Sequence, residues 1–536
     1  MPHSQERPEA TIAPAAPFPP DKSLGNDSSV VRAAAILATG NVASRVLGMA
    51  REMVKANLFG ASGLLSAFEI AAYVPTTLFD LIVGGMVNSS LVPVFSDFTA
   101  QERRGELWGV VSAFLSVTTV ILLLVIVAVE LLAPQVAWLL GAYNLQESSL
   151  TAVSIRLTRL AAPAVLFLSL SSIFTGVLYA LKRFKLPAFT AATFNGAIVV
   201  VALARPEHID SLVYGLLLGS LLQVLLQLPA LRDARLRWNL NWRHPAIRRI
   251  LRLYAPIVVG LVVNQAGIAI GINLATRTGD ASLTYMRYAT TLYQFPLGLV
   301  VTAVSIATLP TLSQQAGGPL RTFKRTLAEG LRLVLALILP ATVGLFALAT
   351  PIIALLFQHG QFTGQDTTVT ALVLRIFLFG LPFAAVDQML IFASYARKDT
   401  VRPAVVGVVT IAIYVVVATS LLRPLGLFSL MVADAAKHIT HTLLMMWVLQ
   451  VQIGGLRGHG IPLATAKSLL AALVTGLVAY VAANLLRLLL PGSLLWQRLL
   501  LVSGSGAAGV ALYFLLVYLL DIGEAKALRH LLQRRR

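Results

Sequence analysis

The chain contains no cysteine, and only 12% of its 536 residues are charged. Without cysteine it can form no disulfide, no thiol nucleophile and no cysteine-ligated metal centre. A glycine-rich phosphate loop of the Walker type is absent, and so is an HExxH zinc motif. We therefore expect that the chain does not hydrolyse ATP itself and holds no zinc or other metal. A membrane glycosyltransferase would need acidic residues on sizeable loops, whereas the longest loops here are short and basic or apolar, so we expect a protein that is not an enzyme and that needs no cofactor.

Apolar sequence is abundant instead, since 57% of the residues are hydrophobic, far more than in a typical soluble protein. Runs of the roughly 20 residues that a helix needs to span a bilayer recur along the whole chain. The alternating segments of a membrane barrel are absent, so helices must satisfy the backbone in lipid. We predict an all-α polytopic membrane protein with about fourteen transmembrane helices. They lie at about 31–57, 65–96, 107–133, 150–181, 187–204, 210–231, 250–276, 281–315, 325–348, 366–396, 403–422, 428–450, 466–488 and 496–520.

Short landmarks inside this apolar sequence recur at one long period. The pairs are Pro93 and Pro310, Pro134 and Pro351, and the segments 179–187 and 395–403, each offset by 216 or 217 positions. Such a repeat predicts a duplicated helical bundle, which is typical of transporters in which one half moves against the other.

The repeat divides the chain into four parts. Residues 1–29 are rich in proline and serine and lack an apolar core, which predicts a disordered cytoplasmic tail rather than a signal peptide. Helices 1–6 form an N-lobe at 30–240 and helices 7–12 a C-lobe at 241–455. Helices 13 and 14 and a basic tail, at 456–536, lie outside the repeat. Because six spans is an even number, we expect both lobes to enter the membrane in the same orientation, related by a pseudo-twofold axis along the membrane normal.

Basic residues are concentrated in alternate loops. Seven arginines lie between positions 232 and 252, in the loop that joins the two lobes. The loops on the other side hold only Arg205, Arg277, Arg423, Arg487 and Arg498. The positive-inside rule places the basic loops, and with them both termini, in the cytoplasm. The net charge of +19 then indicates topology and contact with anionic membrane lipids, not binding of nucleic acid.

Several predicted spans carry charged side chains, which are costly in a bilayer and usually face a partner or a cavity. They are Arg45, Arg51, Glu52 and Lys55 in the first span, Glu69 and Asp80 in the second and Arg287 in the eighth. These charges either pair with each other and tie helices together or line a hydrated cavity for an anion. Arginine suits phosphate because its planar fork donates two parallel hydrogen bonds. The candidate substrate-binding residues are Arg45, Arg51, Glu52, Asp80 and Arg287.

Two further groups of ionisable residues lie in the second half of the chain. Asp387 is a lone acid in the tenth span and a candidate ligand for a proton or a cation. Asp434, Lys437, His438 and His441 share one face of the twelfth span, where they can pair with each other or hold an ion.

The first span also carries a motif with a known likeness. Residues 44–52 read SRVLGMARE and residues 58–61 read LFGA. This pattern resembles the opening of the MurJ (MviN) lipid II flippase family, usually SRxLGxxRD followed by FGA. Further matches follow in the right order at 91–95, 183–188, 294–298, 309–313 and 357–363, so that the resemblance covers residues 30–450.

The resemblance implies a fourteen-helix member of the multidrug/oligosaccharidyl-lipid/polysaccharide exporter superfamily, located in the inner membrane. Such proteins move undecaprenyl-diphosphate-linked sugars from the inner to the outer leaflet. In the family, two six-helix lobes enclose a cationic cavity, and helices 13 and 14 form a groove for the lipid tail. We accordingly expect a lipid-linked glycan as the substrate, membrane lipids as further partners, and a protein that functions as a monomer.

Some positions depart from the family pattern. Arg45 and Arg51 match family cavity arginines, but the helix 2 position reads Phe79 and the helix 8 position reads Thr291. Arg287 lies one helical turn before Thr291 and could replace the missing arginine. Helix 7 has no carboxylate, which argues against a sodium site there. The alternatives to a lipid II flippase are therefore a flippase for another lipid-linked glycan and a non-transporting relative. Whether Na+, H+ or the membrane potential drives transport stays open.

Overall fold

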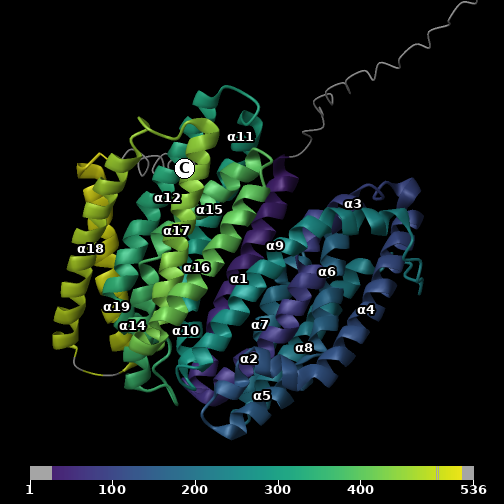
Figure 1. The fold of residues 1–536 in the computed structure, drawn as a ribbon, viewed down its shortest axis with the longest axis horizontal. Coiled ribbons are helices and arrows are strands. Elements are labelled where there is room, and N and C mark those ends of the chain that lie inside the picture. Colours follow the sequence, from purple (N-terminus) through teal and green to yellow (C-terminus); the bar gives the residue numbers. More distant parts are fainter. Residues whose placement is uncertain (1–26, 491, 493, 522–536) are drawn as a thin grey trace, which may run out of the picture.

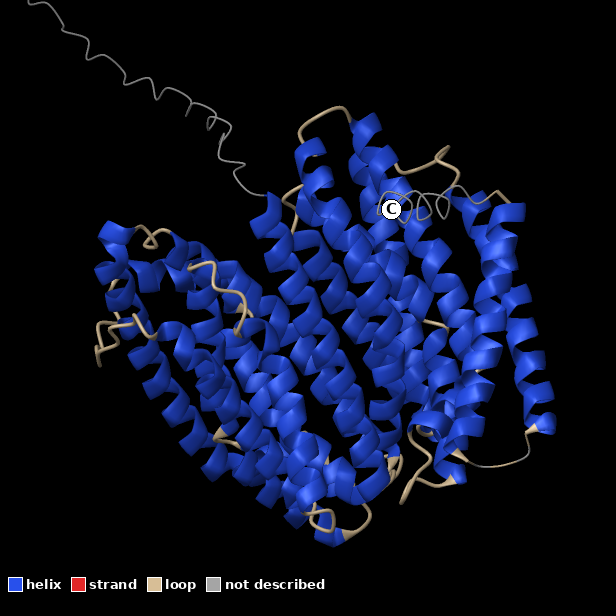
Figure 2. Cartoon of the chain, turned by 180° about the vertical axis from the view of Figure 1, so that it is seen from behind, coloured by secondary structure: helices blue, strands red, loops and turns tan. Residues whose placement is uncertain are grey.

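The computed structural model describes residues 27–490, 492 and 494–521. Every regular element in these ranges is a helix, and no strand occurs among them, as Figures 1 and 2 show. The prediction of an all-α protein is therefore confirmed. The predicted tail lies outside the described residues up to position 26, as does the basic end at 522–536. Helix α1 begins at Asp27, slightly before the predicted start of the N-lobe.

The first half of the chain forms one helical bundle, coloured purple to blue in Figure 1. Its main elements are α1 (Asp27–Phe59), α2 (Gly63–Phe79), the π-helical segments η1 (Asp80–Gly84) and η2 (Val87–Leu91), α3 (Val92–Ser96), α4 (Arg104–Leu139), α5 (Ser148–Ala161), α6 (Ala164–Ala180), α7 (Thr190–Ala204) and α8 (Asp210–Gln227). Helix α7 packs against α1 and α8, α2 against α5, and α6 against α8.

The second half forms a similar bundle. Its elements are α9 (Pro245–Thr276), α10 (Ser282–Pro296), the π-helical segment η7 (Leu297–Val301), α11 (Thr302–Gln315), α12 (Leu320–Ala347), α13 (Ala349–Leu356), α14 (Gly364–Leu378), α15 (Leu381–Ala396), α16 (Val401–Leu425) and α17 (Phe428–Ile453). Helix α17 packs against α15 and α16, α10 against α14, and α12 against α15.

Two more helices, α18 (Ile461–Leu489) and α19 (Leu495–Leu519), lie at the outer edge of the second bundle (Figure 1). They pack against each other, and α18 packs along α12. The hydroxyl of Tyr513 donates to the carbonyl of Ala336 at 2.5 Å, and Arg498 Nη1 donates to the carbonyls of Ala354 and Gln358 at 2.9 Å. These bonds fix α19 to the middle of α12 and to the C-terminal end of α13.

Ten helices in the described residues are long and apolar enough to cross a membrane, or eleven if the bent pair α14–α15 counts as one span. The other three predicted spans correspond to α1, to α10 with η7 and α11, and to α17. These three helical segments carry many of the polar and charged side chains of the interior, which lowers their hydropathy. The total of fourteen spans stays a prediction.

The backbone repeats at the period found in the sequence. The π-helical segment η1 begins at Asp80 and η7 begins at Leu297, 217 positions later. Helices α6 and α15 are followed by Lys182 and Lys398, whose φ angles are 58° and 63°. A left-handed backbone is uncommon for lysine, so its recurrence at equivalent positions is strong support for a duplicated bundle.

Helix α9 connects the two bundles. Ile247, Ile250 and Tyr254 in its first half are buried in a core made otherwise by the first bundle. The hydroxyl of Tyr254 donates to the carbonyl of Leu81 at 2.7 Å. The second half of α9 packs against α10 and α16. Although the sequence predicts a lobe boundary at 240/241, this unbroken helix belongs to both sets of contacts, and the boundary stays a prediction.

The two bundles are joined at one end of the molecule, in the loops after α1, α4, α9 and α13. Figures 1 and 2 show them meeting there and diverging toward the other end. Gly60 has a φ of 61°, and a Cβ on it would lie 2.6 Å from the carbonyl oxygen of Gln361. The joining hydrogen bonds include Ser66 Oγ to Thr284 Oγ1 at 3.0 Å, Tyr288 Oη to the carbonyl of Gly60 at 3.2 Å and the amide of Gln361 to the carbonyl of Asn57 at 3.0 Å.

Candidate functional site

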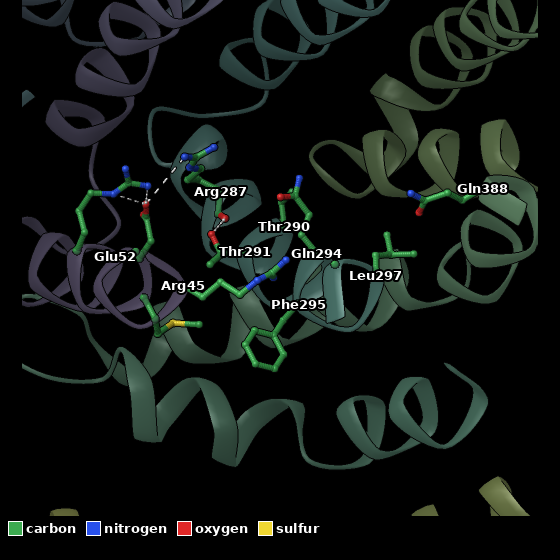
Figure 3. A pocket seen from close by; sticks show the side chains of 13 residues that line it. Arg45, Glu52, Arg287, Thr290, Thr291, Gln294, Phe295, Leu297 and Gln388 are labelled. Carbon is green, nitrogen blue, oxygen red and sulfur yellow. Dashed lines mark hydrogen bonds and ion pairs between the residues drawn. The ribbon is translucent and has the colours of Figure 1, made fainter. Parts of the chain in front are cut away.

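A pocket of about 420 Å³ lies between the bundles, where α1 of the first faces α10, η7 and α15 of the second. Figure 3 shows polar side chains from both sides extending toward it. The lining includes Arg45, Arg51 and Glu52 from α1, Arg287, Thr290, Thr291 and Gln294 from α10, and Gln388 from α15. Residues from both halves of the repeat therefore form one site.

A buried ion-pair network centred on Glu52 forms one wall of the pocket. Its carboxylate is almost completely buried, with 1% of the side chain exposed. Arg51 donates to Glu52 Oε1 from Nη2 at 2.6 Å and from Nε at 3.1 Å. Lys55 Nζ lies 2.7 Å from Glu52 Oε2 and also bonds to Glu69 of α2. An unpaired carboxylate would be very costly here, so this network positions α1 against α2.

Each of the three guanidinium nitrogens of Arg51 donates a hydrogen bond to another protein side chain. Its Nε and Nη2 donate to Glu52, and its Nη1 donates to Oδ1 of Asn195 on α7 at 3.0 Å. Asn195 in turn donates to the carbonyl of Ser44 at 3.2 Å. Arg51 thus contributes its charge to the pocket, while its hydrogen bonds connect α1 with α7.

Arg45 has a different environment. It makes no hydrogen bond or ion pair with any residue in the described part of the chain, although it lines the pocket. Its guanidinium lies against Gly298 at the start of the second bundle's π-helical segment; a Cβ on Gly298 would come within 2.5 Å of Arg45 Nη2. The glycine therefore provides the space that the arginine occupies, and the guanidinium remains available to a ligand.

Arg287 approaches the same network from α10. Its Nη2 lies 3.9 Å from Glu52 Oε1, its Nε lies 3.6 Å from Glu69 Oε2, and 46% of its side chain is exposed. These separations are too long for hydrogen bonds. Arg287 is thus attracted by the carboxylates but still has donors that can turn toward the pocket. The Thr291 hydroxyl donates to the backbone carbonyl of Arg287 at 2.9 Å and makes no hydrogen bond to the Arg287 guanidinium.

Four of the five candidate residues from the sequence, Arg45, Arg51, Glu52 and Arg287, come together in this pocket. Asp80 is not among the residues that line it. At the start of η1 its carboxylate accepts a hydrogen bond from Gln265 Nε2 on α9 at 3.2 Å. Asp80 lies eleven residues after Glu69, about 16 Å further along the helix axis, and is therefore not part of the network around Glu52 and Glu69.

Sequence reasoning did not assign three members of the site. Lys55 and Glu69 are visible as charges within spans, but nothing in their spacing indicates that they bond to each other. Asn195, from α7, has no signal beyond being a polar residue in an apolar span. Their roles depend on how α1, α2 and α7 pack.

A cationic pocket between two repeated helical bundles, which meet at one end and diverge toward the other, is the architecture of an alternating-access membrane transporter. The comparisons with known proteins agree with this class. The sequence model described as "Lipid II flippase MurJ" matches residues 55–500. The chain therefore belongs to the MurJ family.

Individual relatives support the same assignment. A probable lipid II flippase MurJ of Bdellovibrio bacteriovorus is 30% identical over 439 residues, which cover 80% of this chain and 83% of the relative. The lipid II flippase MurJ of Burkholderia cenocepacia is 31% identical over 70% of this chain and 74% of its own. A probable lipid II flippase MurJ of Rhizobium meliloti is 28% identical over 91% of this chain and 94% of its own.

Solved structures show the likeness of the fold. A lipid II flippase MurJ in an inward closed conformation superposes with a TM-score of 0.75 at 21% identity, over 90% of this chain and 98% of that one. An inward-facing MATE family transporter of the MOP superfamily gives a TM-score of 0.61 at 12% identity, over 77% and 94% of the two chains. The predicted exporter fold is thus confirmed.

Proposed function

We propose that this protein is a lipid II flippase, which moves the undecaprenyl-diphosphate-linked peptidoglycan precursor from the inner to the outer leaflet of the cell membrane by alternating access. The observation that carries the proposal is the pocket's excess of positive charge in a chain of the MurJ family. The cations of the pocket and its network outnumber the carboxylates by two; they are Arg45, Arg51, Lys55 and Arg287 against Glu52 and Glu69.

This excess matches the ligand chemistry. A diphosphate with about two negative charges cannot cross an apolar slab of roughly 30 Å unaided. Surrounding the head group with two uncompensated positive charges makes the loaded pocket close to neutral. The prenyl tail can remain in lipid, alongside the exposed apolar faces of α18 and α19. An inside-negative potential would further assist outward movement of the anion by about 2.3 kcal/mol per charge per 100 mV.

The pocket residues have distinct proposed roles. Arg45 and Arg287 contact the diphosphate, because they have guanidinium donors that the described residues leave available. Arg51 and Glu52 position the site, because their polar atoms bond to Asn195, Lys55 and each other. Asp80 pairs the second span with α9 and is left out of the head-group site.

The two bundles would then move about the fixed pocket. Bonds such as Ser66–Thr284 and Tyr288–Gly60 hold one end closed. They must break for the pocket to open toward that side, and the opposite end must close. The protein would work as a monomer, since both halves of the site come from one chain.

Complementation tests the substrate. In a bacterium depleted of its own lipid II flippase, this protein is expected to restore growth. Correctly inserted, well-expressed protein that fails to do so would exclude lipid II as the substrate. If that protein moved another diphosphate-linked glycan in vesicles, the alternative of a different lipid-linked glycan would hold. Failure with every such lipid would favour a non-transporting relative.

The proposed orientation has both termini and the 232–252 segment in the cytoplasm. Because the chain has no cysteine, single cysteines can be placed at Ser23, Arg235 and Tyr143. Tyr143 is 53% exposed and suits labelling better than nearby Gly141, whose φ is 84°. An impermeant thiol reagent outside intact cells is expected to label position 143 only. Labelling at 23 or 235, with all three reactive after permeabilisation as the control, would refute the orientation.

A further inference from the structure

A second group of ionisable side chains lies inside the C-terminal bundle, between α15 and α17. His441 Nδ1 on α17 lies 2.6 Å from Asp387 Oδ1 on α15, with only 12% and 10% of the two side chains exposed. One and two turns earlier on α17, Asp434 pairs with Lys437 at 2.5 Å and lies 3.7 Å from His438 Nε2. We call these five residues the C-lobe cluster.

In the described part of the chain, three phenols interact electrostatically with the carboxylates of the C-lobe cluster. The titratable groups that face it from neighbouring positions are the phenols of Tyr293 on α10, Tyr414 on α16 and Tyr395 on α15. Two arginines on the adjacent helices, Arg332 of α12 and Arg375 of α14, make hydrogen bonds away from the cluster. Arg332 donates to the carbonyl of His459, and Arg375 to Phe346 and Thr350.

The net charge of the C-lobe cluster indicates that the cluster binds one proton. With both histidines neutral, Asp387 and Asp434 bring two negative charges against the single positive charge of Lys437. A buried net charge is strongly disfavoured in a bilayer. One added proton makes the cluster neutral, and Lys437 already compensates Asp434 at hydrogen-bond distance. The proton therefore belongs to the Asp387–His441 pair, where carboxylate and imidazole can share it.

The pair is connected to the substrate pocket through α15. Gln388, the residue after Asp387, lines the pocket between the bundles. Helix α15 also packs against η7, the π-helical segment that carries Gly298 beside Arg45. A movement of α15 relative to α17 that accompanies proton binding would thus displace both Gln388 and η7.

We propose that Asp387 and His441 form a binding site for one exchangeable proton, and that its occupancy is coupled through α15 to occupancy of the head-group pocket. The coupling rests on the proposed function, whereas the proton site does not. In energetic terms, the head group and the proton each change the affinity for the other, and thermodynamic linkage makes the effect reciprocal. The proton gradient would then bias the transport cycle in addition to the membrane potential.

Calorimetry can measure the linked proton. Undecaprenyl diphosphate is titrated into the protein in nanodiscs, at one pH, in two buffers with different ionisation enthalpies. The wild-type chain is expected to take up or release a fraction of one proton per bound lipid. The Asp387→Asn/His441→Gln double variant keeps a hydrogen-bonding pair but cannot hold the proton. In this variant the number of linked protons should fall to the number that the lipid's own phosphates take up or release on binding. His208→Gln, on an exposed loop of the first bundle, is the matched control and should behave as wild type.

A second measurement uses only the wild-type chain and therefore does not depend on whether a variant folds. In the wild-type chain with isotope-labelled histidine, the titration midpoint of His441 is followed by NMR with and without the lipid. A shift of that midpoint on lipid binding supports the proposal. An unchanged midpoint, or a double variant with the same linked protons as wild type, would overturn it. If calorimetry detects no lipid binding, the proposed function fails, but a His441 signal that still titrates together with Asp387 would leave the proton site standing. A His441 signal that never titrates between pH 4 and 9, about 2.5 units either side of the pKa of the free side chain, would refute the proton site.

Discussion

Replacing Arg45 and Arg287 together with alanine is expected to abolish binding of undecaprenyl diphosphate and transport of its glycan. Both guanidinium groups line the pocket, and neither makes a hydrogen bond within the described residues. Hydrogen bonds to charged groups contribute about 1.5–3 kcal/mol each, so each arginine is expected to account for at least about a tenfold change in affinity. Calorimetry in nanodiscs measures the loss.

The arginine experiment has an internal comparison. Arg45→Lys keeps the charge but not the planar fork, so its affinity should lie between those of wild type and Arg45→Ala. Arg325→Ala, which removes a guanidinium 78% exposed outside the pocket, is the matched control and should leave binding unchanged. Equal affinity of the wild type and the double alanine variant would show that the head group binds elsewhere.

Replacing Glu52 with glutamine is expected to destabilise the folded protein by about 3–5 kcal/mol, the usual result of removing one partner from a buried ion pair. Glu52 lies between Arg51 and Lys55, and it is 1% exposed. Its neutralisation leaves the surrounding cations with Glu69 as the remaining carboxylate. The midpoint of thermal unfolding in detergent should fall sharply, and the variant should accumulate poorly in membranes.

The same substitution in an exposed pair is the control for Glu52. Glu106 and Arg103 form a salt bridge of 2.9 Å whose side chains are 59% and 47% exposed. Exposed pairs contribute little to stability, so Glu106→Gln should unfold at the wild-type temperature. If Glu52→Gln also unfolded at that temperature, the network around Glu52 would not be a structural element of the fold, and the separation between positioning and binding arginines would be wrong.

Arg45 and Arg51 show which properties of the site the sequence can predict and which it cannot. Both arginines lie in the motif at 44–52, and the motif does not separate their roles. Packing does so, because α7 brings Asn195 to Arg51, while η7 brings Gly298 to Arg45. These partners lie far away along the chain. No periodicity within α1 could have indicated them.

Asp80 and the C-lobe cluster make the same point. The sequence places Asp80 among the candidate substrate-binding residues, but its carboxylate accepts a hydrogen bond from Gln265 on α9 at the start of a π-helical segment. Asp387 looked like a lone acid in the sequence. The structure gives it His441 as a partner from a helix fifty-four positions away.

Composition, span length and the period of 216 or 217 residues by themselves determined that this is a duplicated, all-helical membrane protein. This was possible because lipid admits few ways of satisfying a backbone, and because duplication leaves a constant offset in the sequence. Only the tertiary structure decided which charges meet, since pairing across a bundle depends on helix rotation, on π-helical breaks and on small residues such as Gly298. The hydrogen bonds that commit Arg51 to the protein and leave Arg45 available exist only once α1, α7 and η7 are packed together.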